Sequence, residues 1–170
     1  GRRAGPGCCT VSQANTPALW VVRHAAPCIA PGTCYGVLNV PADPEATQIA
    51  AQRLATALPN PALLQHSPLQ RCEQLALSLC ALQAHLTSSP DGRLREMDFG
   101  QWEGRLWADI ARDGLDAWTQ DFAHYRPGQG ENLASMLTRV SAALDEAQQH
   151  LLRGTPVVWV THAGVARCVE

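Results

Sequence analysis

Apolar residues are grouped into short continuous runs that alternate with longer segments of helical spacing. The runs at residues 18–22 and 156–160 are almost entirely apolar, and we expect each to form a strand buried on both faces of a parallel sheet. Residues 61–65 predict another strand, and residues 93–99 predict a further extended segment. The polar residues that directly follow these runs would then lie at the carboxyl ends of the strands.

Between these runs, apolar positions recur with the 3.6-residue period of a helix. The pair Ser67 and Pro68 predicts a helix start, with the serine as N-cap and the proline in the first turn. Gly154 is expected to end the longest helix. Helices are predicted over 49–58, 68–79, 102–110, 115–122, 133–151 and 163–169.

Alternating strands and helices predict an α/β fold, a three-layer α/β/α domain with a mainly parallel sheet. Ligands of such domains bind at the carboxyl ends of the strands. Five side chains are expected at or near that edge, although they are far apart in the sequence: Arg23, His24, Arg71, Glu96 and His162.

The length of 170 residues and the apolar content of 46% fit one ordinary domain. We expect a loose N-terminal tail over residues 1–17 and a single domain over 18–170. The tail lacks the apolar centre of a signal peptide, and no apolar run is long enough for a membrane span.

All 13 basic residues are arginine, and with 15 acidic residues they give a formal net charge of −2. This charge provides no general attraction for nucleic acid or an anionic membrane, so neither is an expected partner. The absence of lysine excludes Schiff-base chemistry, and an anion site would have to use guanidinium and imidazole groups.

The seven cysteines show no C-x-x-C spacing, so neither a zinc site nor a closed disulfide framework is predicted. Thiols such as those of Cys72 and Cys80 lie in apolar surroundings, which is typical of a reducing compartment. We therefore expect a cytoplasmic protein that holds no metal.

Two histidines, two arginines and one carboxylate are suited to phosphoryl transfer without a metal. An imidazole is nucleophilic enough to accept a phosphoryl group, and arginines neutralise its oxygens. Either histidine taken alone is more simply explained as a hydrogen-bonded core residue, so the hypothesis depends on the five side chains meeting.

Four blocks of sequence resemble the histidine phosphatase superfamily, whose fold is phosphoglycerate mutase-like. They are Val22-Arg23-His24, S-P-L-Q-R-C at 67–72, L-R-E-M-D-F-G-Q-W-E-G at 94–104, and V-T-H-A-G at 160–164. The blocks occur in the family's order and extend over nearly the whole chain.

The resemblance implies that His24 is the nucleophile and forms a phosphohistidine, while Arg23, Arg71 and His162 hold the phosphate oxygens. Glu96 would protonate the leaving alkoxide and then activate the water that hydrolyses the phosphoenzyme. The family needs no cofactor for this chemistry, and its substrates are small phosphate esters.

Two other carboxylates, those of Asp98 and Glu103, compete with Glu96 for the catalytic role, and Glu131 is left out of catalysis. Glu96 is preferred because the family's acid follows the dipeptide L-R. Glu103 in W-E-G is expected to support a loop, Asp98 to make a structural hydrogen bond, and Glu131 to open the long helix.

Within the superfamily, residues 30–36, 94–104 and 118–127 most resemble the alpha-ribazole phosphatases, which act late in assembly of cobalamin's nucleotide loop. The implied substrate is alpha-ribazole 5′-phosphate or the phosphorylated cobalamin precursor. Tyr35 is an expected substrate contact. Trp107, Trp118 and Tyr125 could stack on the benzimidazole, although core packing is the commoner role of aromatic residues.

Some positions depart from the family pattern. Ala25 replaces a usual glycine, and its Cβ would narrow the approach to phosphate if φ were positive. The chain ends at Glu170 inside the last predicted helix, where family members continue. Two explanations are open: the sequence is C-terminally truncated, or a partner completes the core. The alternatives are a broad-specificity histidine phosphatase, a phosphoglycerate mutase-like enzyme and a non-catalytic binding protein.

Overall fold

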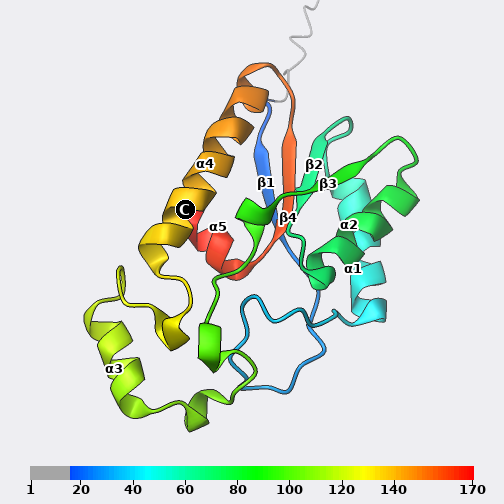
Figure 1. Ribbon diagram of the computed structural model, residues 1–170. Coiled ribbons are helices and arrows are strands. Elements are labelled where there is room, and N and C mark those ends of the chain that lie inside the picture. Colours follow the sequence, from blue (N-terminus) through cyan, green and yellow to red (C-terminus); the bar gives the residue numbers. More distant parts are fainter. Residues whose placement is uncertain (1–15) are drawn as a thin grey trace, which may run out of the picture.

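A four-stranded parallel sheet forms the centre of the molecule, with the strands in the order β1-β4-β2-β3 (Figure 1). This computed structural model describes residues 16–170, so the predicted tail at 1–17 lies almost wholly outside the described residues. The strands are β1 (Leu19–Arg23), β2 (Leu63–His66), β3 (Ser88–Pro90) and β4 (Val157–Thr161).

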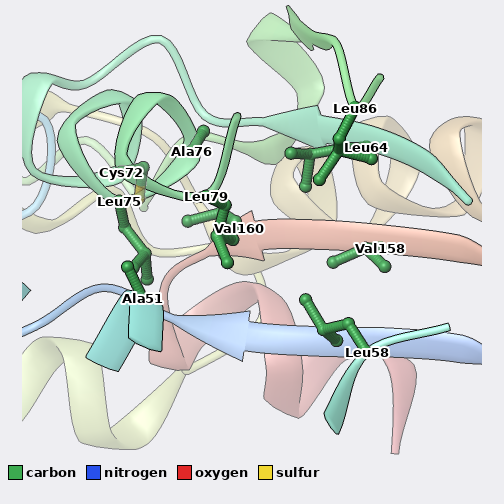
Figure 2. Close-up of a cluster of buried hydrophobic side chains, with 10 residues drawn as sticks. All are labelled: Ala51, Leu58, Leu64, Cys72, Leu75, Ala76, Leu79, Leu86, Val158 and Val160. Atoms are coloured by element: carbon green, nitrogen blue, oxygen red, sulfur yellow. The ribbon is translucent and has the colours of Figure 1, made fainter. Parts of the chain in front are cut away.

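Helices cover both faces of the sheet, which confirms the predicted three-layer α/β fold (Figure 1). The helices are α1 (Pro44–Ala57), α2 (Gln70–Leu82), α3 (Arg112–Gln120), α4 (Leu133–Leu152) and α5 (Ala163–Val169). Figure 2 shows one core, in which Val158 and Val160 of β4 meet side chains of α1 and α2. The alternate residues Val157 and Trp159 face α4 and α5.

The two apolar runs take different places in the sheet. All five residues of β4 are buried, as predicted for a strand covered on both faces. The same prediction is wrong for β1, where Trp20 is 38% exposed. β1 pairs with β4 alone in the described part of the chain, so it is an edge strand with incomplete cover.

The prediction of an extended segment at 93–99 is also wrong. The strand is Ser88–Pro90, and a 3₁₀ turn (Gly92–Leu94) and irregular chain follow it. The backbone carbonyls of Arg93 and Arg95 accept hydrogen bonds from the side chain of Arg139, each at 2.7 Å. A distant guanidinium therefore replaces strand partners, which the local sequence does not reveal.

Two predicted helices differ from the structure: one is absent, and the other begins earlier than predicted. Residues 102–110 contain no α-helix but take part in two 3₁₀ turns, Gly100–Trp102 and Trp107–Asp109. Gly104 between them has φ of 80°, a left-handed conformation that interrupts a helix. The helix predicted at 115–122 is present and begins three residues earlier, as α3.

The start of α2 differs from the prediction because Ser67 does not cap it. The helix begins at Gln70, whose backbone N–H donates to Asn39 Oδ1 at 2.8 Å. A side chain from the loop after β1 thus satisfies an N–H of the first turn. Asn39 thereby fastens this loop to the start of α2.

Two further findings concern the described residues as a whole. No helix within 16–170 has both the length and the apolar character required to cross a membrane. The five cysteines of this range, two of them buried, are free thiols.

The core around α2 provides a test of the packing. Leu75 is fully buried against the sheet, whereas Leu77 on the same helix is 56% exposed. Leu75→Ala should lower the free energy of unfolding by about 2–5 kcal/mol, because it leaves a cavity. Leu77→Ala should change it by about 0.5 kcal/mol or less. Urea denaturation measures both, and equal effects would contradict the assignment of the two faces.

Candidate active site

His24 directly follows β1 at the carboxyl edge of the sheet, and it is buried with 7% exposure. Its Nδ1 lies 2.7 Å from the backbone oxygen of Ala25, so Nδ1 carries the proton and donates it. The Nε2 atom is therefore unprotonated and carries a lone pair, which is the form of imidazole that acts as a nucleophile.

The alanine after His24 causes no backbone strain. Among the described residues, Gln129 is the sole non-glycine residue with positive φ. Ala25 therefore does not need the left-handed conformation that would have favoured glycine at this position.

Arg71 reaches the same place from the first turn of α2, and it is completely buried. Its Nε donates to His24 Nε2 at 3.3 Å. Its Nη1 and Nη2 donate to the backbone oxygens of Leu38 and Gly36 at 2.8 and 2.5 Å. The guanidinium carbon lies 5.3 Å from the ring centre of Tyr35, so Tyr35 reaches the site by stacking on Arg71.

His162 follows β4 and is 1% exposed. Its ring meets that of His24 edge-on, with 5.2 Å between the ring centres. Its Nε2 lies 2.8 Å from Ser67 Oγ, so the serine holds the imidazole in place. The turn that begins at Ser67 was expected at the same edge of the sheet as His162, but Ser67 was given the role of a helix cap and its hydrogen bond to His162 was not predicted.

Both imidazoles are neutral around pH 7. Burial lowers the pKa of His24 to about 4, and the charges of Arg71 and Arg23 act in the same direction. Burial lowers the pKa of His162 to about 2, again with help from Arg71. Desolvation and nearby cations both disfavour an imidazolium ion. The same positive field attracts an anion.

Arg23 lies at the exposed end of β1 and borders a small cavity of about 220 Å³ together with His24. It makes no side-chain hydrogen bond within the described residues. The guanidinium of Arg23 therefore lies near the site, but no hydrogen bond to another described residue holds it in one position.

Glu96 lies beside the start of α5, the helix that directly follows His162. Its Oε1 accepts from the backbone N–H of Met97 at 3.0 Å, and its Oε2 from that of Gly164 at 3.1 Å. A Cβ on Gly164 would collide with Glu96 Oε1. Glycine is thus needed at this position for the carboxylate to approach the helix.

Arg139 on α4 holds the segment that carries Glu96. It donates to the backbone oxygen of Glu96 at 3.2 Å and forms a largely buried ion pair with Glu131, with Nε–Oε1 at 2.7 Å. Glu131 was expected to open the long helix, but it serves this arginine instead. Arg139 was not among the predicted site residues.

The other two carboxylates contact backbone amides. Glu103 accepts from four of them, on Gly36, Val37, Leu38 and Phe99, at 2.9–3.1 Å. Asp98 accepts from the N–H of Gly100 at 2.7 Å. Both contacts agree with the structural roles predicted for these residues.

Most of the aromatic residues pack on one another. Trp102, Trp107, Trp118 and Tyr125 form a small core with Cys34 and Ile110 beside the sheet. Trp107 and Trp118 are stacked, with 6.2 Å between their ring centres. Trp118 additionally lines an apolar cavity of about 370 Å³, which Glu96, Gly164 and Phe122 also border.

The fold thus brings His24, Arg71 and His162 together, with Tyr35 stacked on the arginine. Arg23 borders a cavity with His24, and Glu96 contacts the helix that follows His162. Within residues 16–170, no three His, Cys, Asp or Glu side chains are grouped closely enough to hold a metal ion. A neutral imidazole beside a buried guanidinium can receive a phosphoryl group and stabilise its charge.

Comparison with known proteins agrees with this geometry. The family model described as histidine phosphatase superfamily (branch 1) matches residues 19–169. A search of curated proteins finds no significant match.

Among solved structures, a phosphoglycerate mutase from Thermus thermophilus is 30% identical, with 89% of this chain and 81% of that chain covered and a TM-score of 0.69. TTHB049 from the same organism gives the same identity and coverage, with a TM-score of 0.70. An Escherichia coli K-12 protein proposed to be an alpha-ribazole-5′-P phosphatase is 26% identical, with coverage of 87% and 74% and a TM-score of 0.75.

The lowered histidine pKa values predict a pH dependence of stability. An unfolded histidine has a pKa of about 6.5, so below that pH the unfolded chain binds more protons than the folded one. The free energy of unfolding should therefore fall as the pH drops from 7 to 5. Urea denaturation across this range should give a shallower dependence for His162→Gln. Equal slopes for the two proteins would contradict the neutral, buried state of His162.

Proposed function

The chain belongs to branch 1 of the histidine phosphatase superfamily, and on that premise we propose that it is a metal-independent phosphomonoesterase acting through a phosphohistidine at His24. The observation that carries the proposal is the neutral His24, whose Nε2 lone pair lies 3.3 Å from Nε of a buried arginine. A nucleophile and a phosphate-binding cation are then adjacent.

In the first step, the Nε2 lone pair of His24 attacks phosphorus, and the bond from phosphorus to the leaving oxygen breaks. Arg71, Arg23 and His162 bind the phosphoryl oxygens. Glu96 donates a proton to the leaving oxygen, so the product departs as a neutral alcohol. Its backbone hydrogen bonds to Met97 and Gly164 hold the carboxyl group in place for this transfer.

In the second step, water attacks phosphorus, and Glu96 takes back a proton from it. The bond between phosphorus and Nε2 breaks, its electron pair returns to the imidazole, and inorganic phosphate leaves. The net reaction consumes one water per ester and restores the neutral His24.

The finer proposal is that the substrate is alpha-ribazole 5′-phosphate or the phosphorylated cobalamin precursor. Two observations support it: the 26% identity to the E. coli protein proposed to be an alpha-ribazole-5′-P phosphatase, and the apolar cavity beside Glu96. Trp118 and Phe122 line this cavity, where the benzimidazole carried by the leaving alcohol would be sheltered from water. Trp107 and Tyr125 have no such role in this proposal, because they do not line the cavity.

The similarity to the T. thermophilus phosphoglycerate mutase keeps mutase activity as a second candidate. A mutase returns the phosphoryl group to a second hydroxyl rather than to water.

We also propose a cytoplasmic location, because free thiols persist in a reducing compartment.

A substrate panel tests the proposal. Wild type should hydrolyse alpha-ribazole 5′-phosphate in preference to sugar, nucleotide and glycerate phosphates. His24→Ala should lose this turnover by several orders of magnitude, because the nucleophile is absent. His124→Ala, which alters a largely exposed histidine, is the matched control and should keep full turnover.

The panel separates the alternatives. Broad, weak hydrolysis that requires His24 would keep the phosphatase and reject the named substrate. Transfer between glycerate hydroxyls with a bisphosphate primer would favour the mutase. Full activity of His24→Ala would overturn the mechanism.

A further inference from the structure

We propose that Glu103 is a positioning residue that acts on Arg71 through the backbone of residues 36–38. The inference rests on the proposed function, since it concerns the arginine that would hold phosphate. The carboxylate of Glu103 and the guanidinium of Arg71 both bind the backbone of this three-residue loop, but they bind different groups of it. Glu103 takes the N–H groups and Arg71 takes the carbonyls.

The N–H side of the loop depends on one carboxylate. Glu103 accepts from Gly36 N at 2.9 Å, from Val37 N at 3.0 Å and from Leu38 N at 3.1 Å. A fourth bond, from Phe99 N at 2.9 Å, ties the same carboxylate to its own segment. Hydrogen bonds to an ionised acceptor are stronger than neutral ones, so this anchor fixes the loop in position.

The carbonyl side of the loop depends on Arg71. The oxygens of Gly36 and Leu38 accept from its two terminal nitrogens. Arg71 is fully buried with the loop in place, so a shift of the loop would weaken the hydrogen bonds of a buried charge, which is costly. The direction of the guanidinium, and hence of the Nε–H that points to His24, follows the loop.

Two other contacts exclude alternative positions of this loop. A Cβ on Gly36 would collide with the backbone oxygen of Met97, so the chain is pressed against the segment that carries Glu103. At the far end, Asn39 Oδ1 accepts from Gln70 N, directly before Arg71. The loop is therefore fixed at both ends and offers one geometry to the guanidinium.

Glu103→Gln tests this relay, because an amide has nearly the same shape but only one accepting oxygen for four N–H groups. Asp98→Asn is the matched control: it removes one charge from the same segment, but its single amide partner, Gly100 N, keeps an acceptor. The readouts are the Kd of inorganic phosphate, kcat and KM with p-nitrophenyl phosphate, and the thermal midpoint.

Glu103→Gln should weaken phosphate binding and lower kcat/KM by up to about 100-fold, the order of effect expected when a binding group is misplaced by about 1 Å. Asp98→Asn should leave both values close to wild type. The effect must pass through Arg71, so Glu103→Gln should weaken phosphate binding much less in an Arg71→Ala background. An equal loss in both backgrounds would overturn the relay, as would a lowered thermal midpoint with unchanged phosphate binding.

One further readout, a nuclear magnetic resonance signal, tests the relay separately from the proposed function. The side-chain Nε–H resonance of Arg71 should be a single protected signal in wild type and should shift or broaden in Glu103→Gln. If wild type binds no phosphate or shows no turnover, the proposed function fails while this signal still tests the relay. An unchanged Arg71 resonance in Glu103→Gln would overturn the relay even in an active enzyme.

Discussion

The buried guanidinium of Arg71 is the constraint around which the candidate site is built. A charge that is removed from water is stable only when its N–H groups find acceptors. Here the acceptors are two carbonyls of the loop at 36–38 and the imidazole nitrogen of His24. The loop in turn requires Glu103 for its N–H groups. One buried charge therefore links β1, α2 and the segment after β3.

The same charge accounts for the chemistry that the site can support. Burial and the neighbouring arginines keep His24 and His162 neutral, so each ring has an unprotonated nitrogen at neutral pH. The positive charge of Arg71 is balanced in part by the carbonyls of Gly36 and Leu38 and by the nearby carboxylates of Glu96 and Glu103. The negative charge of a phosphoryl group would neutralise more of this positive charge. The guanidinium is already oriented, so it would not have to rearrange when the phosphoryl group binds.

The sequence predicted some residues of the site and missed others, depending on whether a local pattern or a distant contact places them. Arg23, His24 and His162 follow apolar runs, so their place at one edge of a parallel sheet could be predicted from pattern and motif. The segment from 93 to 110 could not, because Arg139 and Glu103 shape it through bonds to distant backbone groups. Periodicity reports which face of an element is buried, and it carries no information on such contacts. Ser67 was missed for the same reason, since its partner His162 is 95 residues away.

The most direct test of the account is to trap the phosphoenzyme. Wild type mixed with an excess of substrate and quenched in base should carry one phosphoryl group per chain, and peptide mass spectrometry should locate it on His24. The bond should be stable in base and labile in acid, as expected for phosphorus bonded to an imidazole nitrogen. A phosphoryl group on another residue, or turnover with no trapped phosphoenzyme, would contradict the mechanism.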